Sequence, residues 1–356
     1  MKTIFQFYYK LILLTVFFIV LNCLSIYAQK YDSTYYEKYL NRFCTTLSLS
    51  NRNYRIAITN NPYSPEKDTI DVIYKGNTPF TTGVTLDWDI FSLSFSFYGF
   101  SNNEDKKGSS DAFNIYFGWG NAKYIVETYY RYLKGFYDTR SNKYDSIPGN
   151  DDEYNKQPNL TQQILRGKFI YVFNSEKFAF KNGYTAIYHQ KKTAGSFLLQ
   201  GNVFYNKQDN NNSFVPAAYA QSYTYSYQVN YLSNLGFSLG GGYAGTLVMR
   251  KDYFINGTLF LMGEFQHNKL SKTSGDNKEY DNWNAASESR LCLGHNGRVF
   301  YLSVALRAET SIYRLYDIGL RNSILFTDFN IGYRFKVKDP KFMSKVRQNF
   351  LYKVFD

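Results

Sequence analysis

The stretch IFSLSFSFYGF, residues 90–100, alternates large apolar and small polar side chains. Positions 91, 93, 95 and 97 are Phe or Leu, and the positions between them are serine. Successive side chains of a β-strand lie on opposite faces of the strand. One face of this segment is therefore apolar and the other carries hydroxyl groups. The apolar face meets either the core of a soluble protein or the lipid of a membrane, and three further properties of the sequence favour lipid.

The composition is the first of these properties. Aromatic residues make up 20% of the 356 residues, with 36 Tyr and 31 Phe. A soluble core depends more on Leu, Ile, Val and Ala, whereas aromatic-rich sequence is typical of half-exposed strands. The formal net charge is +12. The basic residues are scattered rather than clustered, which with an export signal argues against nucleic-acid binding and favours contact with anionic glycolipid or solvent.

The N-terminus carries that export signal. Lys2 and Lys10 precede the apolar run 11–21, and Ala28 is a small residue at the expected cleavage point. This pattern predicts a secretory signal peptide over residues 1–28. Two alternatives stay open: an uncleaved anchor helix over 11–28, and a lipoprotein cleaved before Cys23. Two cysteines follow the predicted cleavage site, and we expect both to be unpaired because they lie in unrelated parts of the chain.

Strand length is the third property. Many candidate strands have 11 to 15 residues, whereas globular strands average about five or six and membrane-crossing strands need about 9–11. No later apolar run is long enough for a spanning helix. The candidate strands are residues 69–75, 80–88, 89–100, 111–119, 122–133, 161–173, 178–190, 195–205, 222–232, 235–249, 253–267, 283–293, 298–310 and 322–337.

The connections support the same interpretation. Some are tight, as at 120–121 and 250–252, and others are long and polar, as at 101–110, 134–160 and 267–282. Short turns on one side and long loops on the other are typical of outer-membrane barrels. An even strand number places both chain ends on one side, and 14 strands are favoured because the long loops after residues 100, 133, 267 and 310 then all lie outside. This count makes the Asn-rich segment 206–221 a periplasmic loop. If 69–75 and 222–232 are not strands, the count is 12.

The polar faces of these strands carry charges of both signs. A charge facing lipid costs about 2–4 kcal/mol at the membrane midplane, so we expect these side chains to face the lumen. Mixed signs favour an interior ion-pair network over a charge-selective pore. The predicted lumen-facing residues are Lys123, Glu127, Arg131, Arg166, Lys168, Glu264, Arg307, Glu309, Asp328 and Arg334.

Several segments resemble a bacterial family of exported barrel-like proteins known only as a domain of unknown function. They are IYKGN (73–77) leading to Gly83, IVETYYRYLKGFY (125–137) and KKTAGSFLL (191–199). The resemblance covers about residues 51–337 and implies a barrel fold but no activity or site. The last strand is also similar to the signal read by the barrel-assembly machinery, through Asn330, Gly332, Phe335 and Val337. That signal usually ends the chain in an aromatic residue, and here 19 residues follow Val337.

Residues suited to catalysis are few. The three histidines, His189, His267 and His295, all lie at strand ends. A histidine near a long loop, such as His267, is a candidate general base for a serine nucleophile, but solvated loop residues are the simpler interpretation. The sequence contains no phosphate-binding loop, no Cys/His metal spacing and no complete calcium loop. We therefore expect no cofactor, metal or catalytic residue.

These observations predict an all-β protein, a transmembrane antiparallel up-and-down β-barrel of about 12–14 strands in the Gram-negative outer membrane. The expected organisation is a signal peptide (1–28), a periplasmic lead (29–68), the barrel (69–337) and a periplasmic tail (338–356). We expect a monomeric, non-enzymatic narrow pore, anchor or surface-loop scaffold. The expected partners are outer-membrane lipid and glycolipid, and the barrel-assembly machinery during biogenesis. The alternatives are an outer-membrane hydrolase with a rim histidine and a transporter of an apolar ligand.

Overall fold

The computed structural model describes residues 31–39, 42–60, 71–78, 80–100, 106–141, 154–223, 227–315 and 318–337. The predicted signal peptide and the predicted tail lie outside the described residues. The elements are β1 (Tyr36–Lys38), β2 (Arg42–Asn60), β3 (Asp71–Lys75), β4 (Phe80–Trp88), β5 (Phe91–Phe100), β6 (Asp111–Gly120), β7 (Tyr124–Asp138), β8 (Lys156–Val172), η2 (Phe180–Gly183), β9 (Tyr188–Gln190), β10 (Ala194–Asp209), η3 (Ala217–Tyr223), β11 (Val229–Met249), β12 (Tyr253–Lys272), β13 (Asn277–Asn296), β14 (Phe300–Leu315) and β15 (Ile318–Lys336).

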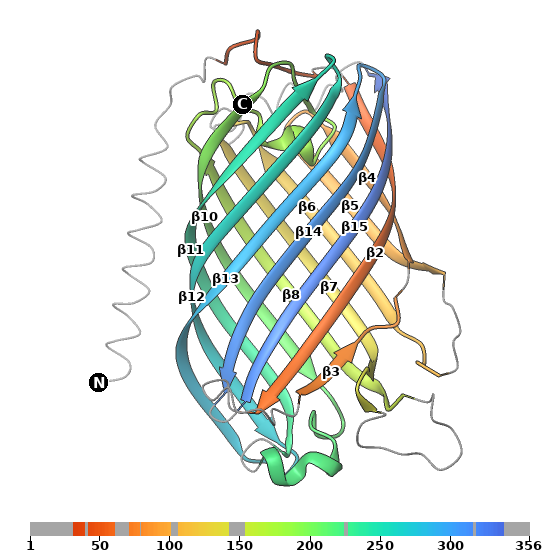
Figure 1. The fold of residues 1–356 in the computed structure, drawn as a ribbon, viewed down its shortest axis with the longest axis vertical. Coiled ribbons are helices and arrows are strands. Elements are labelled where there is room, and N and C mark those ends of the chain that lie inside the picture. The colour runs from red at the N-terminus through yellow and green to blue at the C-terminus, as the bar shows by residue number, and fades with distance from the viewer. Residues whose placement is uncertain are drawn as a thin grey trace.

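A closed antiparallel barrel of 12 strands forms the body of the protein (Figure 1). Its strands run in the order β2, β4, β5, β6, β7, β8, β10, β11, β12, β13, β14, β15. The barrel closes where β15 pairs with β2, from Ile318↔Asn60 to Lys336↔Arg42. The predicted fold class is confirmed, with the lower of the two predicted strand counts.

The outer face of the barrel carries an apolar band. Along β12 the outward positions from Tyr253 to Phe265 are apolar or glycine, and the next two are His267 and Lys269. At a rise of about 3.3 Å per residue and a tilt of about 40°, this run spans about 30 Å. Exposed apolar side chains continue the band on the neighbouring strands, among them Phe197, Leu239, Leu291, Leu302 and Ile331.

Aromatic clusters mark the two edges of this band. Near one edge, Tyr333 contacts Phe300 and Phe335 at ring-centroid distances of 5.2 and 4.7 Å. Near the other, Trp283 contacts Phe265 at 5.2 Å and Phe237 at 6.1 Å. Aromatic girdles at both interfaces accompany the apolar band of membrane barrels. The sequence pattern and the exposed surface therefore define the same membrane-crossing layer.

The two ends of the barrel differ in their connections. At the turn end, uppermost in Figure 1, β11 joins β12 through residues 250–252 and β13 joins β14 through 297–299. The first residue of β2 and the last residue of β15 also lie at this end. At the loop end, lowermost in Figure 1, the connections 101–110, 139–155 and 210–228 are longer. This asymmetry matches the prediction from the sequence.

The strand that pairs with β2 differs between the two ends of the barrel, because β4, β5 and β6 are short. They have 9, 10 and 10 residues, whereas β11, β12 and β13 have 21, 20 and 20. Near the turn end, β2 pairs with β4. Near the loop end, β2 pairs instead with β3, which also pairs with β7. The short strand β3 thus bridges β2 and β7 beyond the point where β4–β6 end.

The predicted start of the barrel is wrong. Residues 29–68 were expected to form a periplasmic lead, but they include β1 and the 19-residue barrel strand β2. The outward positions of β2 change from Leu47 and Leu49 to Asn51, Asn53 and Arg55. The second half of β2 therefore lies beyond the apolar band. Its outer face is polar, so the strand lacks the apolar alternation by which the other strands were predicted.

Three other predicted strands need correction. Residues 178–190 lie inside the turn end as a segment with η2 and the three-residue β9, and residues 222–232 contribute only the first part of β11. Residues 69–75 contribute the bridging strand β3. Segment 206–221 continues β10 and then enters the loop end, not a periplasmic loop. The polar stretch predicted at 267–282 is largely an extension of the β12–β13 hairpin.

Candidate functional site

An ion-pair network crosses the middle of the lumen. Its members come from β7 and β8 on one side and from β13 and β14 on the other, strands that are not neighbours in the barrel. All six charged side chains are at most 7% exposed. The pairs are Arg290–Glu127 at 2.9 Å, Arg290–Glu288 at 2.6 Å, Lys168–Glu288 at 2.5 Å and Arg131–Glu309 at 2.9 Å.

The network is balanced in charge. Three carboxylates face three cations, and Lys168 also approaches Glu309 at 3.8 Å, which connects the pairs. Removing one partner of a buried pair leaves an uncompensated buried charge, at a cost of about 3–5 kcal/mol. The lumen at this level is therefore closed by charged side chains that hold one another in place, as the mixed charge signs indicated.

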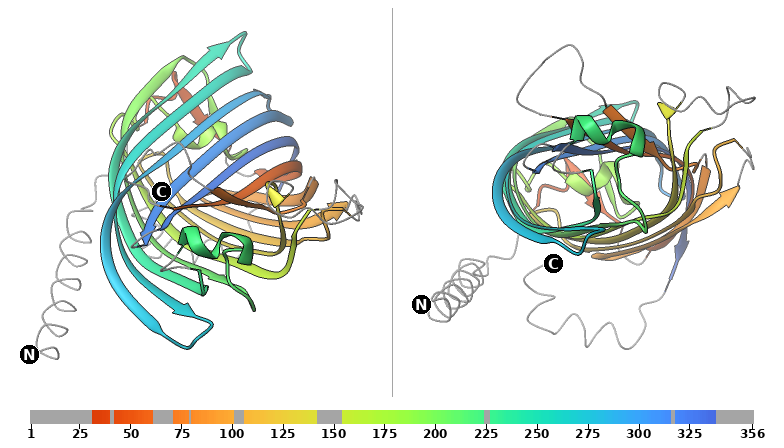
Figure 2. Two further views of the ribbon diagram at one scale, coloured as in Figure 1. Left: turned by 60° about the horizontal axis from the view of Figure 1, so that its bottom comes forward. Right: turned by 90° about the horizontal axis from the view of Figure 1, so that it is seen from below.

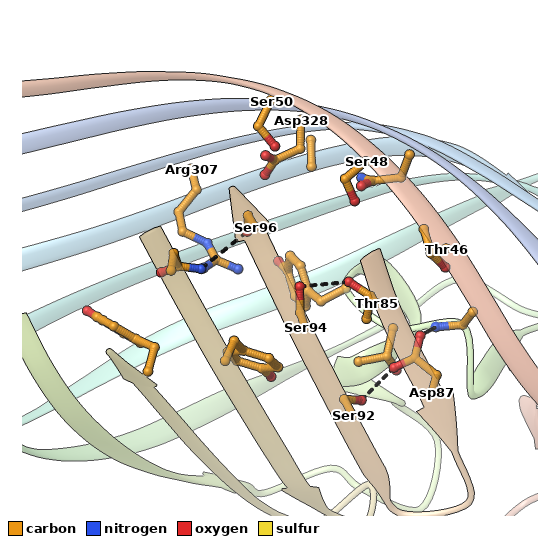
Figure 3. A pocket seen from close by; sticks show the side chains of 18 of the residues that line it. Thr46, Ser48, Ser50, Thr85, Asp87, Ser92, Ser94, Ser96, Arg307 and Asp328 are labelled. Atoms are coloured by element: carbon orange, nitrogen blue, oxygen red, sulfur yellow. Dashed lines mark hydrogen bonds between the residues drawn. The ribbon is translucent and has the colours of Figure 1, made fainter. Parts of the chain in front are cut away.

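A hydroxyl-lined cavity lies beside this network, between β2, β4, β5, β6, β7, β14, β15 and residues 183–186 at the turn end. Its volume is about 150 Å³. Figure 3 shows that Ser92, Ser94 and Ser96, the serines of the opening stretch, point into it. Phe97, on the other face of the same strand, is 56% exposed on the outside of the barrel. The alternation of that stretch thus separates lipid from a polar cavity.

Four charged side chains outside the ion-pair network line the cavity, namely Arg52, Asp87, Arg307 and Asp328. Arg307 on β14 and Asp328 on β15 both line it (Figure 3). Within the described part of the chain, neither has an ion-pair or hydrogen-bonding partner. Arg52, by contrast, donates a hydrogen bond from Nη2 to Ser96 Oγ at 2.8 Å. The cavity therefore offers polar groups of both signs and many hydroxyls, but little apolar surface.

The turn end is filled by residues 174–193, called the turn-end plug here. β9 of the plug pairs with β1, from Tyr36↔Gln190 to Lys38↔Tyr188. Arg334 on β15 donates hydrogen bonds to the carbonyl oxygens of Ala186 (2.8 Å) and Gly297 and to Asn296 Oδ1 (2.5 Å). The plug is thus attached to the wall by polar contacts.

A buried lysine of the plug adds to these contacts. Lys181 Nζ donates to the carbonyl oxygens of Gly120 (2.6 Å), the last residue of β6, and Ile90 (3.3 Å), in the turn between β4 and β5. Desolvation by burial lowers the pKa of Lys181 to about 7, against the opposing effect of the nearby Asp87 carboxylate. This lysine is close to losing its proton at neutral pH.

The loop end is closed by apolar side chains. The segment 210–228, called the loop-end cover here, carries η3 across the mouth of the barrel (Figure 2). Its Phe214, Val215 and Tyr223 are buried in a cluster with wall residues such as Tyr74 and Leu270. The Tyr74 hydroxyl also donates to the Phe214 carbonyl oxygen at 2.7 Å. This end of the lumen is therefore sealed by an ordinary hydrophobic core.

Nine of the ten predicted lumen charges face the interior. Glu127, Arg131, Lys168 and Glu309 are in the network, Arg307 and Asp328 line the cavity, and Arg334 holds the plug. Arg166 lies over the Phe204 ring at 5.4 Å, and Glu264 accepts a hydrogen bond from Gln266. The prediction that Lys123 faces the lumen is wrong. This residue lies in the turn before β7, with Nζ 5.4 Å from the centre of the Tyr124 ring.

Sequence reasoning missed the network's other partners. Glu288 and Arg290 both lie on the inner face of β13, in the stretch NAASESRLCL. They alternate with Ser287 and Ser289, which are also polar, so the sequence does not show which face of the strand points outward. Lys181 was missed because its segment was assigned to the wall. The signal that was available is the shared parity of Glu288, Arg290 and Cys292, with Leu291 and Leu293 on the opposite face.

The histidines lie in three different surroundings. His189 is in the plug, 3.5 Å from both Glu37 and Asp252. His267 is on the outer face of β12, with Nδ1 2.7 Å from Asp281 and Nε2 3.8 Å from Glu279. The His295 ring lies tilted against the Tyr253 ring, with the ring centroids 4.9 Å apart. In the described part of the chain, no hydrogen bond joins a histidine to a serine, so the hydrolase hypothesis gains no nucleophile–base pair.

Other candidate chemistry is limited among the described residues. Cys44 and Cys292 are buried free thiols, as expected. No cluster of three or more His, Cys, Asp or Glu side chains there is arranged to hold a metal ion. None of the described helices is long and apolar enough to cross a membrane.

The residues of the predicted assembly signal are divided between the two faces of β15. Asn330 donates to Ser303 Oγ at 3.1 Å on the inside, and Gly332 lies close to Thr46 there. Phe335 and Val337 are exposed on the outside. Recognition by the assembly machinery stays a prediction.

Comparison with known proteins gives a family and a set of similar folds. Residues 30–335 match the family model described as "Domain of unknown function (DUF4421)". No curated protein matches the chain. Three outer-membrane β-barrel structures are similar. They are the outer membrane protease OmpT from Escherichia coli (7% identity, 84% of this chain and 98% of that chain, TM-score 0.37), the translocator domain of the autotransporter NalP from Neisseria meningitidis (10%, 86% and 90%, 0.34) and the β-domain of the Bordetella autotransporter BrkA (10%, 83% and 98%, 0.31).

Proposed function

We propose that this chain, which belongs to the family described as "Domain of unknown function (DUF4421)", is a sealed, monomeric β-barrel of the Gram-negative outer membrane that acts as an anchor and surface scaffold. The carrying observation is that the lumen is closed at three levels by the chain itself. The turn-end plug closes one end, the ion-pair network crosses the middle, and the loop-end cover closes the other end.

The exposed band supports the membrane location. About 30 Å of outward apolar surface along β12 lies between two aromatic edges, as lipid requires. Short turns and chain ends face the periplasm in outer-membrane barrels, and long loops face outward. The turn end therefore faces the periplasm, and the loop end with its cover faces the cell exterior.

The polar interior argues against transport of an apolar ligand. An apolar pocket is what such a ligand needs, but the cavity is lined by serine, threonine and charged side chains. The apolar surface of the barrel is on its outer face, in the band that contacts lipid. A co-purified lipid or hydrocarbon inside the barrel would contradict this argument.

Ion conductance tests the proposed function. Protein extracted folded from the outer membrane is inserted into planar bilayers, beside the variant Arg334→Gln, which removes the plug's contact with β15. The matched control is Lys336→Gln, an exposed residue on the same strand. We expect silent bilayers for all three proteins, because the ion-pair network and the loop-end cover still close the lumen when the plug is loosened. Steady channels from wild type would make the protein a pore, and charge reversal at Arg307 would then change its ion preference.

The hydrolase alternative has its own test. Variants His189→Ala, His267→Ala and His295→Ala are compared with wild type for hydrolysis of lipid and peptide substrates. We expect no activity that depends on any of the three. A wild-type activity that disappears in His267→Ala would instead establish an enzyme whose site lies on the outer face of β12.

A further inference from the structure

Three basic residues lie together on the outer face of the barrel beyond the apolar band. Arg55 on β2 and Arg321 on β15 are exposed, and Lys75 on β3 is half-buried. Arg55 is the direct cross-strand partner of Lys75. On its other side Arg55 pairs with Ser323, two residues from Arg321. The three side chains, called the basic rim here, therefore share one patch across three strands.

The pairing of Arg55 with Lys75 is unfavourable in isolation. Directly opposite side chains on one face of a sheet have Cβ atoms about 4.5–5.5 Å apart, and like charges at that position are destabilising. Diagonal neighbours lie about 7–8 Å apart, which brings Arg321 within reach. In the part of the chain that the structure describes, none of the three has an ion-pair partner. The fold thus concentrates positive charge that the described protein does not neutralise.

The opposite side of the barrel shows that this arrangement is not general. At the same end of the barrel, Lys207 on β10 pairs with Asp209 at 3.0 Å, and Lys269 on β12 pairs with Glu279 at 3.0 Å. His267 likewise lies 2.7 Å from Asp281. Cations there have carboxylate partners from the chain itself, whereas the basic rim has none among the residues that the structure describes.

The basic rim lies where lipid headgroups meet the barrel. Leu325 on β15 is 48% exposed and pairs with Asn53. Arg55 is the next outward position along β2 after Asn53, so it lies just beyond Leu325, the last exposed apolar side chain among the β15 side chains that the structure describes. The rim is at the loop end, which the proposed function places on the outer leaflet. In the Gram-negative outer membrane that leaflet is built from phosphorylated glycolipid.

We propose that Arg55, Lys75 and Arg321 form a binding site for the phosphate groups of the outer-leaflet glycolipid. This inference rests on the proposed membrane location and adds a specific lipid site to it. Arginine presents a planar fork of donors that fits phosphate oxygens bidentately, and lysine adds a point charge. A phosphate held between the three cations relieves their mutual repulsion. The same contact ties the β2–β15 closure of the barrel to the membrane.

Lipid binding by purified protein tests this proposal. Protein in nanodiscs of uncharged phospholipid is titrated with bisphosphorylated lipid A, and the triple variant Arg55→Gln, Lys75→Gln, Arg321→Gln is compared with wild type. The matched control is Lys207→Gln, Lys269→Gln, which removes two cations that carboxylates already neutralise. A cation beside anionic lipid contributes about a fivefold gain in affinity. We expect the triple variant to bind on the order of a hundredfold more weakly, and the control to bind within about twofold of wild type.

The source of the phosphate is distinguished in the same assay. Lipid A without phosphates should bind wild type as weakly as bisphosphorylated lipid A binds the triple variant. Inorganic phosphate at millimolar concentration should not displace bisphosphorylated lipid A, because it lacks the acyl chains that lie on the apolar band. Displacement by inorganic phosphate would make the rim a site for free phosphate and overturn the proposal.

Two further outcomes separate this proposal from the proposed function. Equal affinity of wild type and triple variant for bisphosphorylated lipid A, with both proteins in the outer-membrane fraction, would overturn the lipid site and leave the sealed barrel intact. Absence of wild type from that fraction would overturn both. Singly substituted Arg55→Gln and Arg321→Gln, each with about a fivefold expected loss, keep the test decisive if the triple variant does not fold.

Discussion

The turn-end plug and the loop-end cover close the same lumen by different physical means. The plug is held by hydrogen bonds and buried charge, chiefly from Arg334 and Lys181. The cover is held by Phe214, Val215 and Tyr223 in an apolar cluster. Polar contacts depend on protonation and on exact partners, whereas apolar burial depends mainly on volume and area. The two ends should therefore fail under different perturbations.

The largest effect is expected at the plug. Arg334→Met removes the donor for four acceptors, the carbonyl oxygens of Ala186, Gly297 and Phe300 and the Asn296 Oδ1. Each buried acceptor left without a donor costs about 1–3 kcal/mol. We expect the free energy of unfolding to fall by about 3–5 kcal/mol, measured by urea unfolding in detergent micelles. Lys336→Met, exposed on the same strand, should leave the unfolding midpoint unchanged. An equal loss in both variants would show that the contact with Ala186 does not hold the plug.

A smaller effect is expected at the cover. Phe214→Ala deletes a buried ring, which in a rigid core costs about 3–5 kcal/mol. A surface segment relaxes around the change, so we expect a loss of about 2–3 kcal/mol and faster proteolysis of segment 210–228 on intact cells. Asn212→Ala, exposed in the same segment, is the control. Unchanged proteolysis in Phe214→Ala would contradict an apolar seal.

Changing pH should affect the plug and not the cover. Burial lowers the pKa of Lys181 to about 7 in the folded protein, against about 10.4 for an unfolded lysine. Between these values unfolding takes up a proton, so stability rises with pH from about 7 to about 10 and falls as the pH is lowered through the same window. We expect a gain of about 2 kcal/mol from pH 7 to pH 9.

The pH effect is isolated by one substitution. Asp87, Asp89, Lys38 and Glu127 also act on Lys181, so the difference between wild type and Lys181→Met in urea unfolding is the relevant quantity. The pH-dependent part of the free energy of unfolding that follows the Lys181 titration should be present in wild type and absent from Lys181→Met. A pH profile that is the same in both proteins would assign the effect to another group.

The smallest effect is expected in the cavity. Ser94→Ala removes one hydrogen bond from Thr85, 2.9 Å long, at a half-buried site, and should cost less than about 1 kcal/mol. Ser92→Ala on the same face should cost more, because its buried hydroxyl donates to Asp87 at 2.6 Å. A greater unfolding loss for Ser94→Ala than for Ser92→Ala would contradict the geometry of the cavity.

Most strands of the barrel wall could be predicted from the sequence, but the segments and contacts inside the barrel could not. Alternation in 90–100 and in 298–310 predicts strands with one lipid face because lipid imposes a uniform apolar pattern. The segment FAFKNGYTAIYHQ, residues 178–190, alternates similarly in part, yet it lies inside the barrel, where both faces are buried. β2 was missed for the opposite reason, because its second half lies beyond the lipid and has a polar outer face.

The candidate site followed the same division. Charges on the inner faces of β7, β8 and β14 were recognisable because their neighbours in sequence are apolar. Their partners Glu288 and Arg290 were not, since SESR shows no apolar contrast. Pairing across the lumen depends on the register of strands far apart in the chain, and no local pattern encodes that register. The sequence therefore predicted a lumen with charges of both signs, but not which charged residues pair with each other.

Thiol labelling tests the sealed lumen most directly. Cys292 is fully buried on the inner face of β13, in a cluster with Ala186 of the turn-end plug. Intact outer membranes are treated with a small membrane-impermeant maleimide, and urea-unfolded protein defines complete labelling. A sealed barrel predicts no labelling of wild type over hours and measurable labelling of Arg334→Met. Rapid labelling of Cys292 in folded wild type would contradict the account, because it would require an aqueous path into the lumen from one end of the barrel.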